Sequence, residues 1–522
     1  MSLVEDILES KGPCLTTDIT AALMEHGLSA EAARKQVSRA GDSVKRLAHL
    51  TFPRNARFVY LKRDYRSDLY WGALHHAVVT QSPAYGPALA ALLLRGGIIP
   101  KAHFQIVCGA PLKQKKQLST AAIYERFKAA GLTEEVHIQG LGVCIATADL
   151  ARSPEAAIPG LKARLIVEEI LLKAVRTWIR NLALASYNKI VTRDDGAEPP
   201  RVGTFAWDLT GPSYLSAITD WNKDRTLKPG FIACDVLLSH VVNKAGMEAF
   251  LKKCSTLRSL KNIGRCLQIF IADRYADDAY HSAREAGVIP ATPASLFGTE
   301  VAEGLNQLAQ VLSTAATASV KPEVFDELFS RLGAIEGAAT NLRGALFELI
   351  VAELVRLVEA GIVTVNKTIR DFDTGEYVEV DVLSYQPNKQ VLFVECKGYQ
   401  PAGTISDTEV ERWLTKRVPF LRQRALYHPD WKDIKHRFEF WTSGSFSIEA
   451  KSMLENASIT TRKYSIGYKD ADAIKEYVKT LQGSPLIKTL NEHFFCHPLA
   501  TAEAAAIAGT GSSTRKIAKK KE

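Results

Sequence analysis

The clearest hydrophobic pattern in the chain is a pair of short segments separated by a polar turn. In residues 377–383 valines alternate with Glu379 and Asp381, and residues 391–394 form an uninterrupted apolar run. Alternation with a period of two predicts a strand with one buried face, and the apolar run predicts a buried strand. Residues 386–389 between them read Gln-Pro-Asn-Lys, which is typical of a turn. The pattern therefore predicts an antiparallel hairpin.

The second strand of this hairpin ends in charged residues. Glu395-Cys396-Lys397 follows the apolar run directly, and Glu395 and Lys397 share one face because side chains alternate along a strand. Charge at a buried position is costly unless a metal, a phosphate or an ion pair compensates it. Upstream, an apolar helix is predicted over residues 344–358, and it carries Glu348 on a stripe of small and apolar neighbours. Together these residues predict one acidic pocket that contains one lysine.

The length of the turn decides whether the two strands can form such a pocket. A turn of two or four residues would pair Asp381 with Val394 and leave Asp381 and Glu395 on opposite faces of the sheet. A loop with an odd number of residues, or a bulge, would bring both carboxylates to one face. Either arrangement is open at this point.

The order of the acidic residues and the lysine resembles the PD-(D/E)XK, or restriction-endonuclease-like, superfamily of metal-dependent phosphodiesterases. The residues that carry the resemblance are Glu348, Asp381, Glu395, Cys396 and Lys397. The resemblance covers residues 341–478, with a late strand at 438–447 and a helix at 448–456. It implies an α/β nuclease domain over residues 322–500.

The resemblance also implies a role for each residue of the motif. Asp381 and Glu395 would hold one or two Mg²⁺ ions, with Mn²⁺ as a substitute, because hard cations prefer carboxylate oxygen. Glu348 would bind the metal directly or through water. Lys397 would orient the attacking water and stabilise charge on the phosphate. Cys396 faces the other way and is predicted to be a core thiol.

Residues 1–65 have the pattern of a winged helix. Helices are predicted to begin at Val4, over 16–25 and over 30–46, followed by a β-wing at 50–61. Such a module places its third helix in the major groove and its wing on phosphate. The predicted DNA-contacting residues are Arg34, Lys35, Arg39, Arg54 and Arg57. A winged helix that binds protein, with a merely solvated basic face, is the alternative.

A second module of the same kind is predicted over residues 66–150. Residues 118–132 echo 28–41, an apolar helix precedes them at 85–95, and 136–146 would form the wing. The predicted phosphate contacts here are Lys115 and Lys116.

The central part, residues 160–315, is predicted to be a degenerate copy of the nuclease domain. A helix over 163–185 places Glu168 and Glu169 where Glu348 stands, and strands are predicted at 202–208, 231–237 and 267–272. Asp235-Val236-Leu237 occupies the place of Glu-x-Lys, and leucine lacks the charge of lysine. An inactive scaffold or DNA-holding domain is therefore expected. The alternatives are an ordinary α/β domain, or a metal held by Asp208 and Asp235.

Three linkers, a basic helix and a tail complete the predicted organisation. The linkers are predicted at 65–71, 193–201 and 315–322, and residues 501–522 are predicted to be a disordered basic tail. A helix over 405–426 carries Arg412 and Lys416, which are further candidates for gripping the DNA backbone; a solvated face is the alternative. The fold class expected for the whole chain is multidomain α/β.

Composition permits this interpretation without requiring it. Among 522 residues, 66 are Lys or Arg and 57 are Asp or Glu, so the net charge of +9 suits a polyanionic ligand. There is no apolar stretch of about 18 residues and no secretory signal, and the eight cysteines lack a C-x-x-C pair. A cytoplasmic protein with reduced thiols and no membrane partner is expected.

The sequence thus predicts a Mg²⁺-dependent endonuclease that cuts double-stranded DNA, and by family analogy we expect a role in restriction or anti-phage and anti-plasmid defence. One active site cuts one strand, so duplex cleavage would need a homodimer, a partner protein or two successive nicks. The sequence contains no P-loop, so the chain is not expected to power its own translocation. Two alternatives remain: a non-catalytic winged-helix DNA-binding regulator, and an RNA-cutting or repair nuclease that uses the same pocket.

Overall fold

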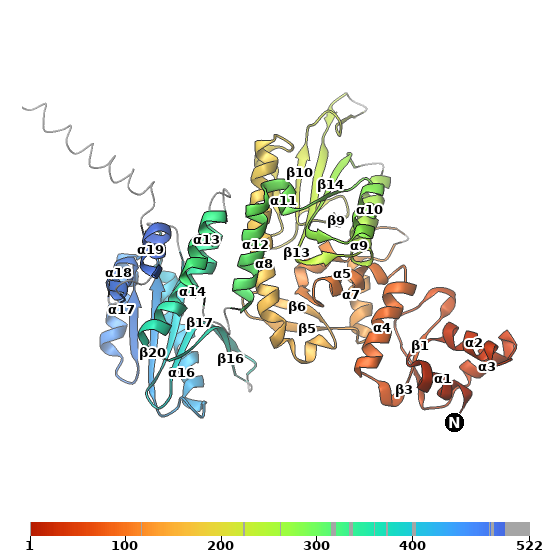
Figure 1. Cartoon of the computed structure of the whole chain (residues 1–522), viewed down its shortest axis with the longest axis horizontal. Coiled ribbons are helices and arrows are strands. Elements are labelled where there is room, and N and C mark those ends of the chain that lie inside the picture. Colours follow the sequence, from red (N-terminus) through yellow and green to blue (C-terminus); the bar gives the residue numbers. More distant parts are fainter. Residues whose placement is uncertain are drawn as a thin grey trace, which may run out of the picture. The chain divides into compact units, whose positions relative to one another are not determined.

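The computed structural model describes most of the chain up to Phe495. The residues outside the description are 1, 116, 223–224, 261–262, 315–319, 333–337, 360, 372–373, 399–402, 480, 482–484 and 496–522. The predicted basic tail, Lys116 and most of the predicted linker at 315–322 therefore lie outside the described residues. The chain divides into two compact units, Met1–Ala302 and Glu303–Glu522, whose elements are labelled in Figure 1. In the described part, no helix combines the length and hydrophobicity needed to cross a bilayer.

The first 61 residues fold into three helices and a small antiparallel sheet. The elements are α1 (Leu3–Lys11), β1 (Cys14–Leu15), α2 (Thr16–Glu25), α3 (Ala30–Ser38), β2 (Val44–Arg46) and β3 (Phe58–Leu61), with strand order β1-β3-β2. Ser29 caps α3 by accepting a hydrogen bond from the backbone of Ala32. The predicted extension of this helix to Arg46 is wrong. Gly41 and Asp42 are poor helix formers, and Val44 instead pairs with Leu61 in the sheet.

The next segment, up to Thr147, shares its core with the first. Its elements are α4 (Asp68–Gln81), α5 (Gly86–Leu94), β4 (Ile98–Pro100), α6 (Phe104–Val107), α7 (Thr120–Ala129), β5 (Thr133–Ile138) and β6 (Gly142–Thr147), with strand order β4-β6-β5. Tyr70 and Trp71 are buried in one apolar cluster with Phe58 of β3 and Phe127 of α7. The prediction of a linker at 65–71 is therefore wrong: these aromatic residues belong to α4 and fill the core between the two segments.

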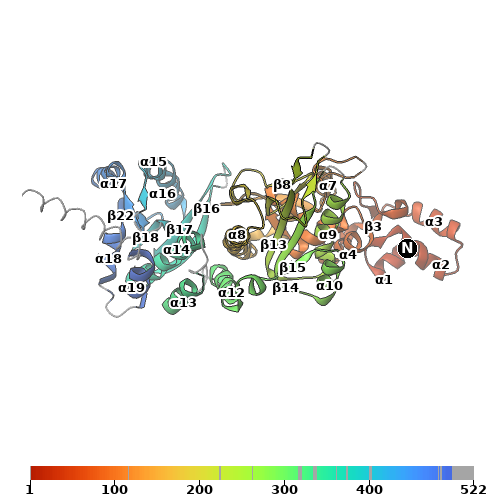
Figure 2. The same ribbon diagram turned by 90° about the horizontal axis from the view of Figure 1, so that it is seen from above.

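A long helix and a mixed five-stranded sheet form the central domain. The helix is α8 (Ile158–Asn181), and the strand order is β7 (Val191–Thr192), β10 (Leu209–Ser213), β13 (Gly230–Val242), β14 (Cys266–Tyr275) and β15 (Ile289–Ala291). The first two pairings are antiparallel and the last two are parallel. Helices α9 (Lys244–Ser259) and α10 (Asp277–Glu285) connect the parallel strands, and Figure 2 shows α8 and α9 on opposite sides of the sheet.

The predicted strand at 202–208 is corrected by the structure. Residues 201–206 form a separate tight hairpin of β8 (Arg201–Val202) and β9 (Phe205–Ala206), which turns at Gly203 with a positive φ of 61°. Asp208 lies just before β10, a strand that the sequence interpretation missed. A second small hairpin, β11 (Asp220–Trp221) with β12 (Leu227–Lys228), extends from the domain, and α11 (Pro293–Phe297) and α12 (Thr299–Thr314) follow β15.

The C-terminal unit repeats the same plan. Helices α13 (Pro322–Leu332) and α14 (Ala338–Glu359) precede a sheet of order β16 (Ile362–Arg370), β17 (Tyr377–Gln386), β18 (Gln390–Lys397), β20 (Lys435–Thr442) and β22 (Ser465–Lys469). Two antiparallel pairings are again followed by two parallel ones. The connecting helices are α15 (Asp407–Arg412), α16 (Val418–Tyr427) and α17 (Ile448–Thr460), and α14 and α16 lie on opposite sides of the sheet (Figure 2).

The remaining C-terminal elements are short. They are β19 (Thr404–Ile405), which pairs in parallel with β21 (Ser445–Phe446), then α18 (Ala471–Lys479), α19 (Pro485–Leu490) and a π-turn at Asn491–Phe495. The helix predicted over 405–426 is interrupted. It begins at Asp407 and contains a π-helical turn, Trp413–Arg417, between α15 and α16. The apolar side chains of α15–α17 pack on the sheet face that carries Val391 and Phe393.

Candidate active site and its counterpart in the central sheet

The loop of the hairpin β17–β18 has an odd number of residues, and this number determines which residues of the two strands face each other. Gln386 pairs with Gln390, so three residues form the turn, and Asn388 adopts a positive φ of 59° that asparagine tolerates. Val382 pairs with Val394, which places Asp381 opposite Glu395. Directly opposed residues of an antiparallel pair point to the same face, so both carboxylates lie on one side of the sheet.

One backbone hydrogen bond and two ion pairs hold the acidic residues in place. Oδ2 of Asp381 accepts a hydrogen bond from the backbone N–H of Cys396 at 2.7 Å. Oε1 of Glu395 lies 3.0 Å from Nζ of Lys397, and Oε2 of Glu395 contacts the guanidinium of Arg417. Glu395 is only 8% exposed, whereas the Lys397 side chain is 34% exposed. A buried carboxylate at the end of β18 is thus bound by two cations at the edge of the protein.

Glu348 reaches the same place from α14. A Cβ added to Gly398 would lie 2.7 Å from the Cβ of Phe347 and 2.8 Å from the carbonyl oxygen of Arg343. The glycine after Lys397 therefore allows α14 to pack directly against the end of β18. Glu348 is half-buried on this turn of the helix, and its charge interacts with that of Asp381.

Burial and mutual repulsion shift the pKa values of these acids upward. Burial, followed by the nearby Glu395 charge, raises the pKa of Asp381 to about 7. Burial and the charge of Asp381 likewise raise the pKa of Glu348 well above its usual range. Although burial alone would lower the pKa of Lys397, Glu395 and Asp381 raise it above its ordinary value. The pocket therefore has more negative charge than its own cations compensate.

The donor chemistry of this pocket fits a hard divalent cation. Asp381, Glu395 and Glu348 offer carboxylate oxygens, and the raised pKa values of Asp381 and Glu348 mean that added positive charge would be favourable there. Within the described residues, no three His, Cys, Asp or Glu side chains lie together in an arrangement that could hold a metal ion as it stands. The oxygens of Glu395 are taken by Lys397 and Arg417 instead.

A cavity of about 130 Å³ opens beside Glu395 and Lys397. It is lined further by Glu409, Arg412, Trp413, Arg417 and Phe440. Of the two residues predicted on the following helix, Arg412 lines this cavity, whereas Lys416 is exposed and does not. Arg417 is the residue that the predicted site lacked. Its place in a basic helix was visible in the sequence, but the π-turn that directs it to Glu395 was not.

The other predicted DNA-contacting residues lie on the surface of the N-terminal unit. Arg34, Lys35 and Arg39 are exposed on or just after α3, and Lys35 pairs with Glu31 at 2.8 Å. Arg54 and Arg57 are exposed in the loop between β2 and β3. Lys115 is exposed in the connection before α7.

The central sheet places acidic residues at the equivalent positions. Leu209 pairs with Cys234, so Asp208 stands opposite Asp235, as Asp381 stands opposite Glu395. Oδ2 of Asp208 accepts a hydrogen bond from the N–H of Val236 at 2.8 Å, which matches the bond from Cys396 to Asp381. Leu237 is buried at the position of Lys397.

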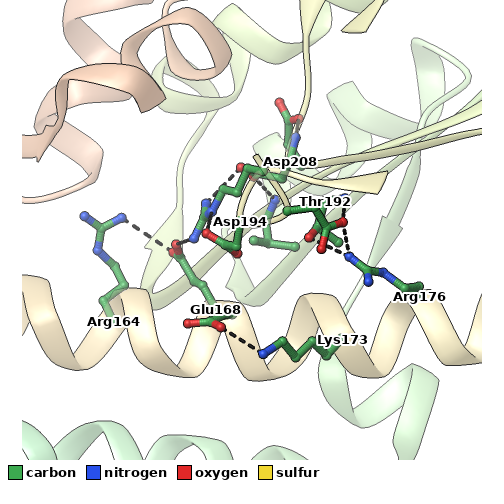
Figure 3. Close-up of polar contacts among 12 residues, drawn as sticks. Arg164, Glu168, Lys173, Arg176, Thr192, Asp194 and Asp208 are labelled. Carbon is green, nitrogen blue, oxygen red and sulfur yellow. Dashed lines mark hydrogen bonds and ion pairs between the residues drawn. The ribbon is translucent and has the colours of Figure 1, made fainter. Parts of the chain in front are cut away.

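Internal cations neutralise this second cluster. Arg193 donates to Oδ1 of Asp208 and to Oε2 of Glu168, both at 2.8 Å, and Arg164 lies 3.5 Å from Oε1 of Glu168. Figure 3 shows the carboxylates of Glu168 and Asp208 in this network. Glu168 also accepts from the N–H of Leu238 at 3.2 Å. Glu169, the other glutamate predicted for this place, pairs instead with Lys173 at 2.9 Å (Figure 3).

Lys253 of α9 supplies the cation for Asp235. Its ammonium contacts Oδ2 of Asp235 and donates to the carbonyl of Ala206 at 3.0 Å, and the residue is fully buried. Burial raises the pKa of Asp235 to about 6, and Lys253 limits the rise. For Asp208, burial would raise the pKa, but Arg193 and the hydrogen bond from Val236 together lower it below its ordinary value. Because both carboxylates already have internal cations, the structure disfavours the alternative that Asp208 and Asp235 hold a metal.

Arg193 was not identified by its sequence context. It lies in the segment 193–201 that was interpreted as a linker, next to two aspartates and upstream of a Pro-Pro pair. In the structure it is 8% exposed and bridges α8 to the start of β10. A local pattern of charged and turn-forming residues does not distinguish a solvated arginine from one that is paired across a fold.

Comparison with known proteins adds little to this geometry. No protein family matches the sequence, and no curated protein matches it. A solved structure of the restriction endonuclease FokI aligns with 87% of this chain and 80% of its own, at 11% sequence identity and a TM-score of 0.21. A likeness this low carries no inference about fold or activity.

Proposed function

We propose that the chain is a Mg²⁺-dependent endonuclease of restriction-endonuclease-like fold that hydrolyses phosphodiester bonds in DNA. The observation that carries the proposal is the convergence of Asp381, Glu395 and Lys397 on one face of adjacent strands, beside a cavity with further cations. The excess of buried negative charge supports it, because such a cluster is unfavourable unless a cation compensates it.

Each residue has a role that its place supports. Asp381 and Glu395 would hold the metal, and Glu348 would assist from α14. A bound Mg²⁺ lowers the pKa of a water ligand and neutralises charge on the scissile phosphate. Lys397, which stays protonated because its pKa is raised, would orient the attacking water and stabilise the developing phosphate charge. The cavity gives the phosphate a place next to this ammonium.

The N-terminal unit is proposed to bind the DNA. The order α1–β1–α2–α3–β2–β3 with a three-stranded antiparallel sheet supports a winged helix, and the exposed residues of α3 and of the β2–β3 loop are basic. Phosphate contacts from such residues would supply affinity and position the duplex. The hairpin β5–β6 after α7 supports a second, less basic module of the same kind.

The central domain is proposed to be a non-catalytic copy of the nuclease domain. Its sheet has the same strand order and sense as the C-terminal sheet, and its acidic residues occupy equivalent register positions. Arg193 and Lys253 take the place of external cations, and Leu237 replaces the lysine. The domain would therefore contribute a rigid, non-catalytic platform.

Cleavage assays on the purified full chain test the proposal. Supercoiled plasmid, linear duplex DNA and RNA are each incubated with Mg²⁺ or with a chelator, beside the variants Lys397→Ala and Lys451→Ala. We expect Mg²⁺-dependent cutting of DNA by the wild type and Lys451→Ala, and a large loss of cutting by Lys397→Ala. Lys451 is the matched control because it is an exposed lysine of α17 that does not line the cavity.

The other outcomes separate the alternatives. Preference for RNA would favour an RNA-cutting or repair nuclease with the same pocket. Tight DNA binding without any metal-dependent cutting by the wild type would favour a non-catalytic regulator. A defence role would further require that cells expressing the chain restrict incoming plasmid or phage DNA, and that Lys397→Ala abolish this restriction.

A further inference from the structure

We propose that Arg417 exchanges between Glu395 and a substrate phosphate, and thereby couples metal binding to substrate binding. The inference rests on the proposed nuclease function but concerns a residue that the motif does not contain. Both oxygens of Glu395 are engaged, Oε1 by Lys397 at 3.0 Å and Oε2 by Arg417. A metal held by Glu395 would compete with these cations for the carboxylate oxygens.

Arg417 is the cation that can leave. Lys397 lies two residues from Glu395 on the same face of β18, so the strand itself holds the two side chains next to each other. Arg417 comes from a different element, its side chain is 30% exposed, and it lines the cavity together with Arg412. A guanidinium binds phosphate oxygens with two parallel hydrogen bonds, so a phosphate in the cavity is a suitable new partner.

The backbone conformation of the helix directs the Arg417 side chain toward Glu395. The buried residues of the helix are spaced three or four apart, as expected for an α-helix, except for the five-residue step from Trp413 to Val418. That step is the π-helical turn, which inserts one extra residue and ends at Arg417. Such turns are rare and are frequently found at functional sites. The insertion allows Trp413 and Val418 both to remain buried while Arg417 points to Glu395.

The central domain offers the contrasting case. Lys253 on α9 occupies the equivalent place, on the first helix after the motif strand, and contacts the equivalent acid Asp235. It is fully buried and also donates to the carbonyls of Ala206 and Ile106, so it has no route to an external partner. Helix α9 is regular over Lys244–Ser259, without a π-turn. Of these two cations, Arg417 lines a cavity, whereas Lys253 is enclosed by the protein.

The coupling has a definite sign. When phosphate draws Arg417 away, Glu395 is released for the metal; when the metal takes Glu395, Arg417 is released for phosphate. Each ligand therefore raises affinity for the other by the same factor. Removing the guanidinium has two opposite effects: it frees Glu395 for the metal, and it removes a phosphate contact.

Metal titration of the full chain tests this directly. Mn²⁺ binding is measured by calorimetry for the wild type, Arg417→Ala, Arg417→Lys and the control Lys451→Ala, without nucleic acid and then with a short phosphorothioate duplex. Lys451 is an exposed lysine of α17 that does not line the cavity. Without the duplex, we expect Arg417→Ala to bind Mn²⁺ on the order of fivefold more tightly than the wild type. With the duplex, the wild type should gain affinity for Mn²⁺ and Arg417→Ala should gain little. Arg417→Lys should be intermediate, and Lys451→Ala should match the wild type.

The same variants separate this inference from the proposed function. Weaker or unchanged Mn²⁺ binding by Arg417→Ala, with a thermal unfolding profile like that of the wild type, would overturn the exchange. So would absence of Mn²⁺ binding by every variant. If Arg417→Ala binds Mn²⁺ more tightly but the wild type cuts no nucleic acid, the competition for Glu395 stands and the nuclease proposal fails. If the wild type cuts DNA, Arg417→Ala should combine tighter metal binding with slower cutting, which loss of structure alone does not produce.

Discussion

In the central sheet, the carboxylates of Asp208 and Asp235 are paired with Arg193 and Lys253, which are buried with them. In the C-terminal sheet, Glu395 is paired with Lys397 and Arg417, and both of these are partly exposed beside a cavity. The two sheets share their strand order and the sense of every pairing. The two sheets therefore differ in the source of the positive charge that neutralises their carboxylates. In the central sheet, buried arginine and lysine side chains supply it. In the C-terminal sheet, the cavity leaves room for a cation from outside the protein.

The largest expected effect is on DNA cleavage, and it concerns Lys397 of the C-terminal sheet, which corresponds to Leu237 in the central sheet. Lys397→Ala should reduce DNA cleavage by about 100- to 1,000-fold, because the ammonium is a preorganised charge at the phosphate. The rate is measured on supercoiled plasmid at saturating Mg²⁺. Leu237→Lys in the Lys397→Ala background should restore no cutting, since Arg193 and Lys253 still occupy the central acids. Recovery of activity there would mean that the central cluster is a usable site.

The next effect concerns the stability of the central domain. Arg193→Ala should lower the free energy of unfolding by about 3 kcal/mol, because it leaves Glu168 and Asp208 buried without their shared partner. Urea denaturation followed by circular dichroism measures it. The control Lys173→Ala, which breaks a half-exposed pair with Glu169, should cost less than about 1 kcal/mol. Equal losses for the two variants would contradict the idea that Arg193 is an internal counter-ion.

A smaller effect should appear in the pH dependence of stabilisation by Mg²⁺. The pKa of Asp381 is raised to about 7, so its ionisation costs stability as the pH rises from its unfolded value, about 3.9, through 7. Without metal, the C-terminal unit should thus be less stable near pH 8 than near pH 5. At the lower pH, Mg²⁺ must displace the proton of Asp381 in order to bind. The increase in melting temperature that Mg²⁺ causes should therefore be larger at the higher pH. Thermal unfolding with and without Mg²⁺ measures this, and Asp381→Asn should remove most of the difference.

The smallest effect is expected for the basic residues of α3, which lie far from the central and C-terminal sheets in the sequence. Arg34→Ala should weaken duplex binding several-fold and reduce the slope of log affinity against log salt by about 1, because one phosphate contact is lost. Fluorescence anisotropy over a range of salt concentrations measures the slope. Lys35→Ala should have less effect, since Lys35 is already paired with Glu31. If neither variant alters the slope, α3 does not contact DNA phosphate.

Much of the candidate site could be predicted because its chemistry is concentrated in short segments. The alternation of β17, the apolar run of β18 and the charged end of β18 all lie within about 20 residues, so periodicity alone placed Glu395 and Lys397 on one face. Predictions that depended on where one element ends were less successful. The helix expected to reach Arg46 stops at Ser38, and the strand expected at 202–208 is a hairpin followed by β10.

The partners that come from distant segments were not predictable in this way. Arg193 was placed in a linker, Lys253 was not singled out, and Arg417 lies in a predicted basic helix of which only Arg412 and Lys416 were singled out. An ion pair forms between side chains that the fold brings within about 4 Å of each other. The local sequence around a lysine or arginine does not indicate which carboxylate that will be. Tyr70 and Trp71 show the same limitation for apolar residues, because their core is shared with β3 and α7.

By itself, the amino-acid sequence determined the two strands of the acidic hairpin, the face that Glu395 and Lys397 share, and the loss of the lysine at Leu237. These properties follow from side-chain alternation and residue type, which are local. Tertiary structure alone decided the three-residue turn that aligns Asp381 with Glu395, the closure of the central cluster by Arg193 and Lys253, and the approach of Arg417 through a π-turn. Each of these depends on how segments far apart in the chain pack, because burial and charge pairing are properties of the folded core rather than of any one segment.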